Sequence, residues 1–280
     1  MWRYLIQHPE IFMPRERVKK EPAYFSDISG YESQDRYYSL FDDVQEQHIA
    51  VGEASTAYLS DPASAEHIAA EIPEARIIIM LRNPVDRAYS LYNWMAQEGY
   101  EYAPSFEYAL ELEDRRIDSE YFKSNNSQYY YNYLYFHSGL YSRQVEKYFD
   151  EFGREYVMVV IFERFVLDTL SVYQRVCQFL GVDPSIFPDI EVHNESRSVR
   201  FPPLQYMLRR ILGVFNHLLG RTTIEKDRRD ALLRLGLSEQ PPPDLQAPLR
   251  DKMIEAYRDD IRRLEKILDR DLSQWYASTE

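Results

Sequence analysis

The most informative run of residues reads RIIIMLRNPVDRAYS, from Arg76 to Ser90. Five consecutive apolar residues, Ile77 to Leu81, are dense in β-branched types. A run this short and this apolar is typical of a strand that is buried on both faces in a parallel sheet. Pro84 then suits the first turn of a helix, because its missing N–H needs no partner there. The apolar positions that follow recur at helical spacing and are Val85, Ala88, Tyr92 and Met95.

A second strand is predicted from Tyr156 to Phe162, between two helices over Leu140–Phe152 and Leu170–Leu180. Gly181 stands where a helix C-cap glycine belongs. Strands that alternate with helices predict a three-layer α/β core with a parallel sheet flanked by helices. Beyond Pro203 the pattern is wholly helical. We expect a single domain over residues 1–280, with an α/β core over about 1–200 and a helical C-terminal flank over about 201–280. Further helices are expected before Pro9 and over Pro62–Ile72, Leu204–Leu219 and Leu249–Leu268.

Composition and charge limit the class of protein. The chain has 280 residues, and its 33 basic against 46 acidic residues give 33 − 46 = −13. Apolar residues make up 45% of the chain, which excludes disorder as a description of the whole. The single Cys177 excludes an intramolecular disulfide and a cysteine-based zinc site. The acidic balance argues against nucleic acid as a partner. Without a membrane-length apolar run or a signal peptide after Met1, the sequence predicts a cytoplasmic protein with no membrane partner.

Arg82 and Ser90 are the first candidate binding residues. In open α/β sheets, ligands bind at the carboxyl ends of strands, and helix N-termini favour anions. Arg82 would emerge at that edge with a planar guanidinium suited to phosphate or sulfate, and the Ser90 hydroxyl lies two helical turns further on. On spacing alone, the alternative that Arg82 pairs with an acidic neighbour and Ser90 only packs is equally good.

The run from Arg82 to Ser90 resembles the 3′-phosphate-binding motif of sulfotransferases that use 3′-phosphoadenosine 5′-phosphosulfate (PAPS). It is more similar to the branch of heparan-sulfate and bacterial carbohydrate sulfotransferases than to the phenol and steroid enzymes. The resemblance covers nearly the whole chain and implies a P-loop-like fold. The supporting motifs, in the family's order, are residues 7–12 (QHPEIF), 20–25 (KEPAYF), 52–59 (GEASTAYL), 138–141 (SGLY), 179–182 (FLGV) and 271–275 (DLSQW).

The resemblance also implies roles for individual residues. Arg82 and Ser90 would hold the 3′-phosphate of the nucleotide, and Glu21 matches the family's general base. Arg197 lies where the family closes a loop over the nucleotide, although a solvated basic turn explains that region as well. Without the motif, Glu21 would be interpreted as a loop residue paired with Lys19 or Lys20. The implied reaction is sulfuryl transfer from PAPS, as co-substrate and without a metal, to a hydroxyl or amine of a carbohydrate or small-molecule acceptor.

The start of the chain departs from the family pattern. Family members begin with a strand and a Lys-x-Gly-Thr-Thr-like loop around the 5′-phosphosulfate, whereas Trp2 to Pro9 resembles the helix that follows that loop. The expectation is therefore that the first strand and its loop are absent. Two explanations are open: an N-terminally truncated version of an active enzyme, or a catalytically inactive protein that binds a nucleotide or a partner on the same scaffold.

Three further features bear on the acceptor and on metals. Glu53 and Ser55 follow a short strand near where the acceptor should enter, but Ala54 replaces the Lys that some carbohydrate-modifying relatives carry. The tyrosine-rich run from Tyr129 to Tyr135 either faces an acceptor or, as we consider more common, packs between helices. The six His residues lack metal-ligand spacing, so no metal is expected.

Overall fold

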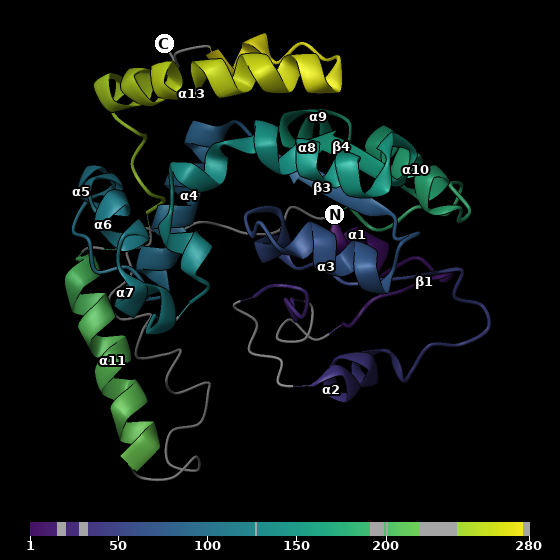
Figure 1. Ribbon diagram of the computed structural model, residues 1–280, viewed down its shortest axis with the longest axis horizontal. Helices are drawn as coiled ribbons and strands as arrows, with labels where there is room; N and C mark the ends of the chain where they lie inside the picture. The colour runs from purple at the N-terminus through teal and green to yellow at the C-terminus, as the bar shows by residue number, and fades with distance from the viewer. Residues whose placement is uncertain are drawn as a thin grey trace. The chain divides into compact units, whose positions relative to one another are not determined.

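The computed structural model describes residues 1–15, 21–27, 33–126, 128–190, 199, 201–218 and 240–276. The contact pattern divides the chain into two compact units, which we describe separately. The first unit comprises Met1–Asn83, Tyr141–Val192 and Asp260–Arg270, and the second comprises Pro84–Leu140, His193–Asp259 and Asp271–Glu280. Figure 1 shows the ribbon with its helices and strands labelled.

The first unit contains the strands. Its elements are α1 (Trp2–Leu5), β1 (Ile11–Phe12), α2 (Gln34–Tyr38), η1 (Ser39–Phe41), β2 (Ala50–Val51), η2 (Thr56–Leu59), α3 (Ser64–Glu71), β3 (Ile77–Leu81), α8 (Tyr141–Phe152), η5 (Arg154–Tyr156), β4 (Val157–Ile161), α9 (Phe162–Leu167) and α10 (Thr169–Leu180). Both strand pairs in the described residues, β1 with β2 and β3 with β4, are parallel. The predicted α/β class, with parallel strands flanked by helices, is confirmed.

The strand pair β3–β4 carries the positions that matter for function. Ile77 lies opposite Val157 and Leu81 lies opposite Ile161, so the two carboxyl ends meet at one edge. Figure 1 shows the two strands side by side, with α8, α9 and α10 around them. Helices α1, α9 and α10 and strands β1 and β4 supply a buried core, whose residues are Tyr4, Leu5, Ile11, Met13, Val160, Phe165, Val172, Tyr173, Val176, Cys177 and Val182.

Helix α10 shows how local sequence sets an element's bounds. The Asp168 side chain caps its N-terminus by accepting a hydrogen bond from the Ser171 N–H at 3.1 Å. Gly181 ends the helix with φ 78° and ψ 24°, a left-handed conformation that suits glycine. The Val182 N–H then donates to the Cys177 carbonyl at 3.0 Å. The glycine C-cap predicted from the sequence is confirmed.

Helix α3 begins later than the sequence predicted. The Asp61 carboxylate accepts hydrogen bonds from the Ala63 N–H at 2.9 Å and from the Asp27 N–H at 3.0 Å. These bonds hold residues 61–63 in a turn, and the helix starts at Ser64 instead of Pro62. Aspartate competes for nearby backbone donors in this way, which favours caps and turns over helix interiors.

The second unit is helical in its described residues. It contains α4 (Pro84–Gln97), α5 (Phe106–Glu111), α6 (Glu113–Ile117), α7 (Glu120–Ser124), η3 (Tyr130–Tyr133), η4 (His137–Gly139), α11 (Pro202–Leu218) and η6 (Ser273–Tyr276). The long helix α13 (Ala247–Leu268) is shared by both units, which divide at Asp260. Helix α4 starts at the predicted proline, and its buried residues include all four predicted apolar positions, Val85, Ala88, Tyr92 and Met95.

A buried ion pair organises the second unit. The Arg116 guanidinium donates to the Glu101 carboxylate at 2.8 Å, and both side chains are almost fully buried, at 3% and 0% exposure. The Tyr135 hydroxyl donates to the other Glu101 oxygen at 2.7 Å, and the Ala103 N–H donates at 2.9 Å. Tyr130, Tyr133 and Tyr135 are buried, so for these three tyrosines the packing interpretation is confirmed.

Candidate functional site

Arg82 follows the last residue of β3, at the edge where β3 and β4 both end. Its guanidinium carbon lies 5.3 Å from the centre of the Phe162 ring, the first residue after β4. The Tyr141 hydroxyl donates a hydrogen bond to the Arg82 carbonyl at 3.1 Å, which fixes the backbone at this point. The predicted position of Arg82 at the carboxyl end of a parallel strand is therefore the observed one.

The charge of Arg82 is available for a ligand. The side chain is half-buried, and within the described part of the chain no carboxylate pairs with its guanidinium. A carboxylate does lie at the same strand edge, on Glu163 of α9. One Glu163 oxygen accepts a hydrogen bond from the Asn83 backbone N–H at 2.8 Å, which ties the β3–α4 junction to α9. The alternative that an acidic neighbour neutralises Arg82 is not observed among the described residues.

The structure does not test whether Ser90 and Arg197 bind the same ligand as Arg82. Ser90 is the seventh residue of α4 and is half-buried, in the second unit. Arg82 belongs to the first unit, so a phosphate site shared by the two side chains stays a prediction. Arg197 lies outside the described residues.

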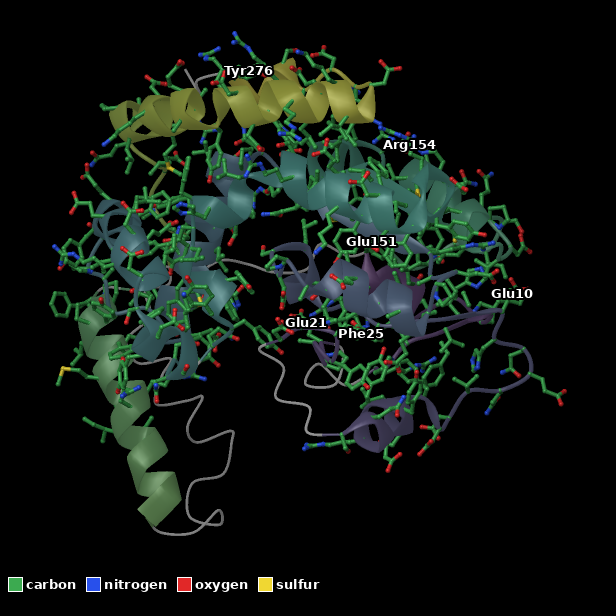
Figure 2. All side chains as sticks on the ribbon, viewed as in Figure 1. Glu10, Glu21, Phe25, Glu151, Arg154 and Tyr276 are labelled. Atoms are coloured by element: carbon green, nitrogen blue, oxygen red, sulfur yellow. The ribbon has the colours of Figure 1, made fainter. Side chains whose placement is uncertain are left out.

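Glu21 lies in the segment between β1 and α2, near Phe25, and both are labelled in Figure 2. Its half-buried carboxylate accepts a hydrogen bond from the Thr56 hydroxyl at 3.1 Å. Lys19 and Lys20, the alternative partners expected from the sequence, lie outside the described residues. Two residues on, Ala23 is fully buried and has φ 51°, and its N–H donates to the Ser55 hydroxyl at 2.8 Å. The segment that carries Glu21 is thus held by residues 55 and 56.

Glu53 lies beside this pair of contacts. One of its oxygens accepts the Ser55 N–H at 2.6 Å, and the other accepts a hydrogen bond from the Tyr58 hydroxyl. Burial raises the pKa of the Glu53 carboxyl from 4.5 to about 7, the nearby Glu21 charge adds to the rise, and hydrogen bonds from Tyr58 and Ser55 oppose it. No cation among the described residues pairs with Glu53. Such a carboxyl titrates near neutral pH, which is a property of many functional sites.

Sequence reasoning missed three contributors. Glu163, Phe162 and Thr56 were not proposed, although the first two could have been found. Because parallel strands end at one edge, the residues after β4 had to face those after β3. Thr56 gave no such signal, since its bond to Glu21 joins residues 35 positions apart through a loop.

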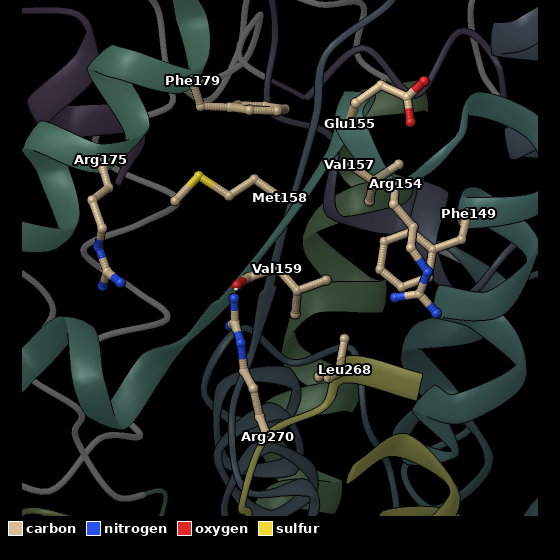
Figure 3. A pocket seen from close by; sticks show the side chains of 10 residues that line it. All are labelled: Phe149, Arg154, Glu155, Val157, Met158, Val159, Arg175, Phe179, Leu268 and Arg270. Atoms are coloured by element: carbon tan, nitrogen blue, oxygen red, sulfur yellow. Dashed lines mark hydrogen bonds between the residues drawn. The ribbon is translucent and has the colours of Figure 1, made fainter. Parts of the chain in front are cut away.

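A separate pocket of about 380 Å³ lies at the beginning of β4, away from the strand ends that carry Arg82 (Figure 3). The Arg270 guanidinium donates there to the Val159 carbonyl at 2.7 Å. The other lining residues are Phe149, Arg154, Glu155, Val157, Met158, Arg175, Phe179 and Leu268. None of the predicted site residues contributes to this pocket.

Among the described residues, His, Cys, Asp and Glu side chains do not gather in groups of three or more that could hold a metal ion. Likewise, none of the described helices combines the length and the apolar character needed to cross a membrane.

The profile of the sulfotransferase family matches residues 10–186, well over half of the chain. The crystal structure of a sulfotransferase from Alicyclobacillus acidocaldarius superimposes with a TM-score of 0.71 at 31% identity, covering 98% of this chain and 92% of that one.

Two curated relatives are longer proteins. The membrane-associated sulfotransferase kil1 of Dictyostelium discoideum is 30% identical over 114 residues, which are 39% of this chain and 23% of kil1. The bifunctional heparan sulfate N-deacetylase/N-sulfotransferase 1 of Caenorhabditis briggsae is 22% identical over 221 residues, 78% of this chain and 24% of that protein. The matched regions thus span about a quarter of each relative. The family profile and the structural similarity together show that the chain belongs to the sulfotransferase family.

Proposed function

We propose that this protein transfers a sulfuryl group from PAPS to a hydroxyl or amine of a carbohydrate or small-molecule acceptor. The observation that carries the proposal is the Arg82 guanidinium, which lies at the carboxyl end of β3 without a carboxylate partner among the described residues. In a chain with net charge −13, a cation left unpaired at a strand edge is suited to an anionic ligand.

On the nucleotide side, Arg82 would hold the 3′-phosphate with a planar pair of N–H donors. Ser90 would add a hydroxyl donor from α4, and Arg197 would add a second guanidinium. When bound, PAPS supplies a sulfuryl group attached to a phosphate leaving group. The hydrogen bond that the Asn83 N–H donates to Glu163 holds the backbone next to Arg82, so the guanidinium is presented from a fixed point.

On the acceptor side, Glu21 would act as the general base. As the acceptor oxygen forms its bond to sulfur, the sulfur–phosphate oxygen bond breaks and the acceptor proton passes to the Glu21 carboxylate. The Thr56 hydroxyl holds that carboxylate in one orientation, which favours proton transfer along a defined line. Because one relative is named as a heparan sulfate N-sulfotransferase, an amine of a sugar is a natural acceptor to test beside a hydroxyl.

The test is transfer of labelled sulfuryl from PAPS to N-desulfated heparin, which offers amines, and to 4-nitrophenol, which offers a hydroxyl. Transfer by the wild-type protein should fall by about 10²- to 10⁴-fold in Glu21→Gln, since that change removes the base but keeps the shape. The exposed Glu120→Gln, which loses only a surface pair with Lys123, serves as the matched control. Unchanged transfer in Glu21→Gln would overturn the role of Glu21. Absence of both transfer and nucleotide binding would overturn the proposed function.

A further inference from the structure

The segment Glu53–Tyr58 forms a hydrogen-bonded turn around one carboxylate. The Glu53 carboxylate accepts hydrogen bonds from the Ser55 N–H and from the Tyr58 hydroxyl, so it links the beginning of the turn to its end. The Tyr58 carbonyl is in turn held by the Tyr148 hydroxyl of α8 at 2.9 Å. The turn is therefore anchored to a long helix on one side and closed on Glu53 on the other.

Two side chains that leave this turn hold the segment of Glu21. Ser55 accepts the Ala23 N–H, and Thr56 donates to the Glu21 carboxylate. Ala23 has φ 51°, in the left-handed region that a residue with a Cβ adopts at a cost of about 1–2 kcal/mol. A residue in such a conformation persists only when its surroundings hold it there. The Ala23 N–H donates to the Ser55 hydroxyl, and this bond depends on how the turn presents that hydroxyl.

We infer that Glu53 is a positioning residue for sulfuryl transfer: through Ser55 and Thr56 it fixes the strained Ala23 backbone and the direction of the Glu21 carboxylate. This inference rests on the proposed function, because it assigns the purpose of the turn to the reaction of Glu21. Glu53 acts through other residues and is not assigned a contact with substrate.

The charge of Glu53 fits this role. Among the described residues, the ionisable groups that face it are Glu21, Tyr37, Tyr58 and Tyr148, so an ionised Glu53 would place a second negative charge near Glu21. The protonated carboxyl avoids that repulsion: one oxygen still accepts from the Ser55 N–H, and the O–H can donate to the Tyr58 oxygen, because a hydroxyl oxygen accepts as well as donates. A glutamine at position 53 likewise keeps an acceptor for the Ser55 N–H and offers an N–H to the Tyr58 oxygen, whereas alanine has neither. The two substitutions therefore separate hydrogen bonding from charge.

The experiment compares Glu53→Ala and Glu53→Gln with Glu146→Ala. Glu146 is the control, because it also accepts a side-chain hydrogen bond, from Arg263, within the same unit. The first readout is hydrogen–deuterium exchange of the peptide over residues 21–27, which reports the Ala23 N–H without any catalysis. The second is steady-state kinetics of sulfuryl transfer, with kcat and the KM for PAPS measured separately.

We expect Glu53→Ala to speed exchange at Ala23 by at least about tenfold and to lower kcat by about 10- to 100-fold, as a misplaced catalytic group does. The KM for PAPS should stay within about twofold, because the nucleotide contacts are on Arg82. Glu53→Gln should restore slow exchange and most of kcat, and Glu146→Ala should change neither.

Two results would overturn the inference. One is exchange at Ala23 in Glu53→Ala that equals that of the wild type. The other is a kcat that stays unchanged although exchange at Ala23 becomes fast, since the held backbone would then have no bearing on the reaction. A wild-type protein that neither binds nucleotide nor transfers sulfuryl would instead contradict the proposed function, and the exchange readout would still show whether Glu53 holds the segment.

Discussion

Glu101 and Glu53 are two carboxylates, one in each unit; Glu53 is half-buried, and the partners of the two differ. Glu101 is fully buried and meets a full positive charge, the Arg116 guanidinium at 2.8 Å, together with the Tyr135 hydroxyl and the Ala103 N–H. Within the described part of the chain, the donors to Glu53 are neutral, namely the Ser55 N–H and the Tyr58 hydroxyl. The first arrangement keeps a charge in place, whereas the second favours the protonated form near neutral pH.

The difference in partners indicates a structural role for Glu101 and a role at the candidate site for Glu53. A buried carboxylate with a cation, a hydroxyl and an N–H is satisfied, and it ties helices and loops together. A carboxylate without a cation is costly when ionised, so stability alone does not explain a glutamate at position 53. The hydrogen bonds from its turn to the Glu21 segment point to a role in the reaction instead.

The largest expected effect comes from breaking the pair in the second unit. Arg116→Leu leaves the Glu101 charge buried without its cation, so the free energy of unfolding should fall by about 3–5 kcal/mol. Urea unfolding at pH 7 measures this loss. The double variant Glu101→Gln/Arg116→Leu should recover much of it, because no uncompensated charge is left. A loss below about 1 kcal/mol would instead put the pair in the class of weak surface pairs.

Neutralising Glu53 should raise the free energy of unfolding at alkaline pH, whereas breaking the Arg116–Glu101 pair lowers it. Its folded pKa of about 7 exceeds its ordinary value of 4.5, so the unfolded chain releases the proton first. The contribution of Glu53 to stability is thus complete below about pH 4.5 and is lost as the pH rises through about 7. At pH 8, Glu53→Gln should be more stable than the wild type by up to about 3 kcal/mol, and near pH 4.5 the two should be equal.

The measurement is urea unfolding of both proteins between pH 4.5 and pH 8, with Glu101→Gln alongside. At pH 8 that control should lose stability, since Arg116 is left without its carboxylate. A difference between wild type and Glu53→Gln that does not grow with pH would show that folding does not raise the pKa of Glu53.

Removing the Tyr58 hydroxyl should have the smallest effect. Tyr58→Phe deletes a hydrogen bond that lowers the pKa of Glu53, so that pKa should move above 7. The stability cost should be about 1 kcal/mol, the usual size of one hydrogen bond. Urea unfolding as a function of pH measures both the stability loss and the pKa of Glu53. A pKa that falls instead of rising would contradict a hydrogen bond donated by Tyr58 to Glu53.

The fold could be predicted well because its signals are local. The apolar runs at β3 and β4 and the proline at the start of α4 gave bounds within one residue of those observed. Each of these signals depends on neighbours along the chain, such as β-branched residues in a row or apolar residues at helical spacing. Ser90 and Arg197 were proposed by resemblance, and their roles are still predictions.

The candidate site could be predicted only in part, because its chemistry depends on distant contacts. The position of Arg82 followed from the strand that precedes it. The environment of Glu53 did not, since its significance arises from burial and from bonds that join residues 21 and 23 to residues 56 and 55. Spacing along the chain carries no information about such loop-to-loop contacts, and neither does composition.

The most direct test of the central claim, that this is a PAPS-dependent sulfotransferase, is a calorimetric titration of 3′-phosphoadenosine 5′-phosphate into the protein. We predict micromolar binding to the wild type and a loss of at least about tenfold in Arg82→Ala, because charge-assisted hydrogen bonds to the phosphate are removed. Arg263→Ala, which breaks an exposed pair with Glu146, should bind as the wild type does. Binding that is equally strong in Arg82→Ala, or no binding by a folded wild-type chain, would contradict the assigned nucleotide site.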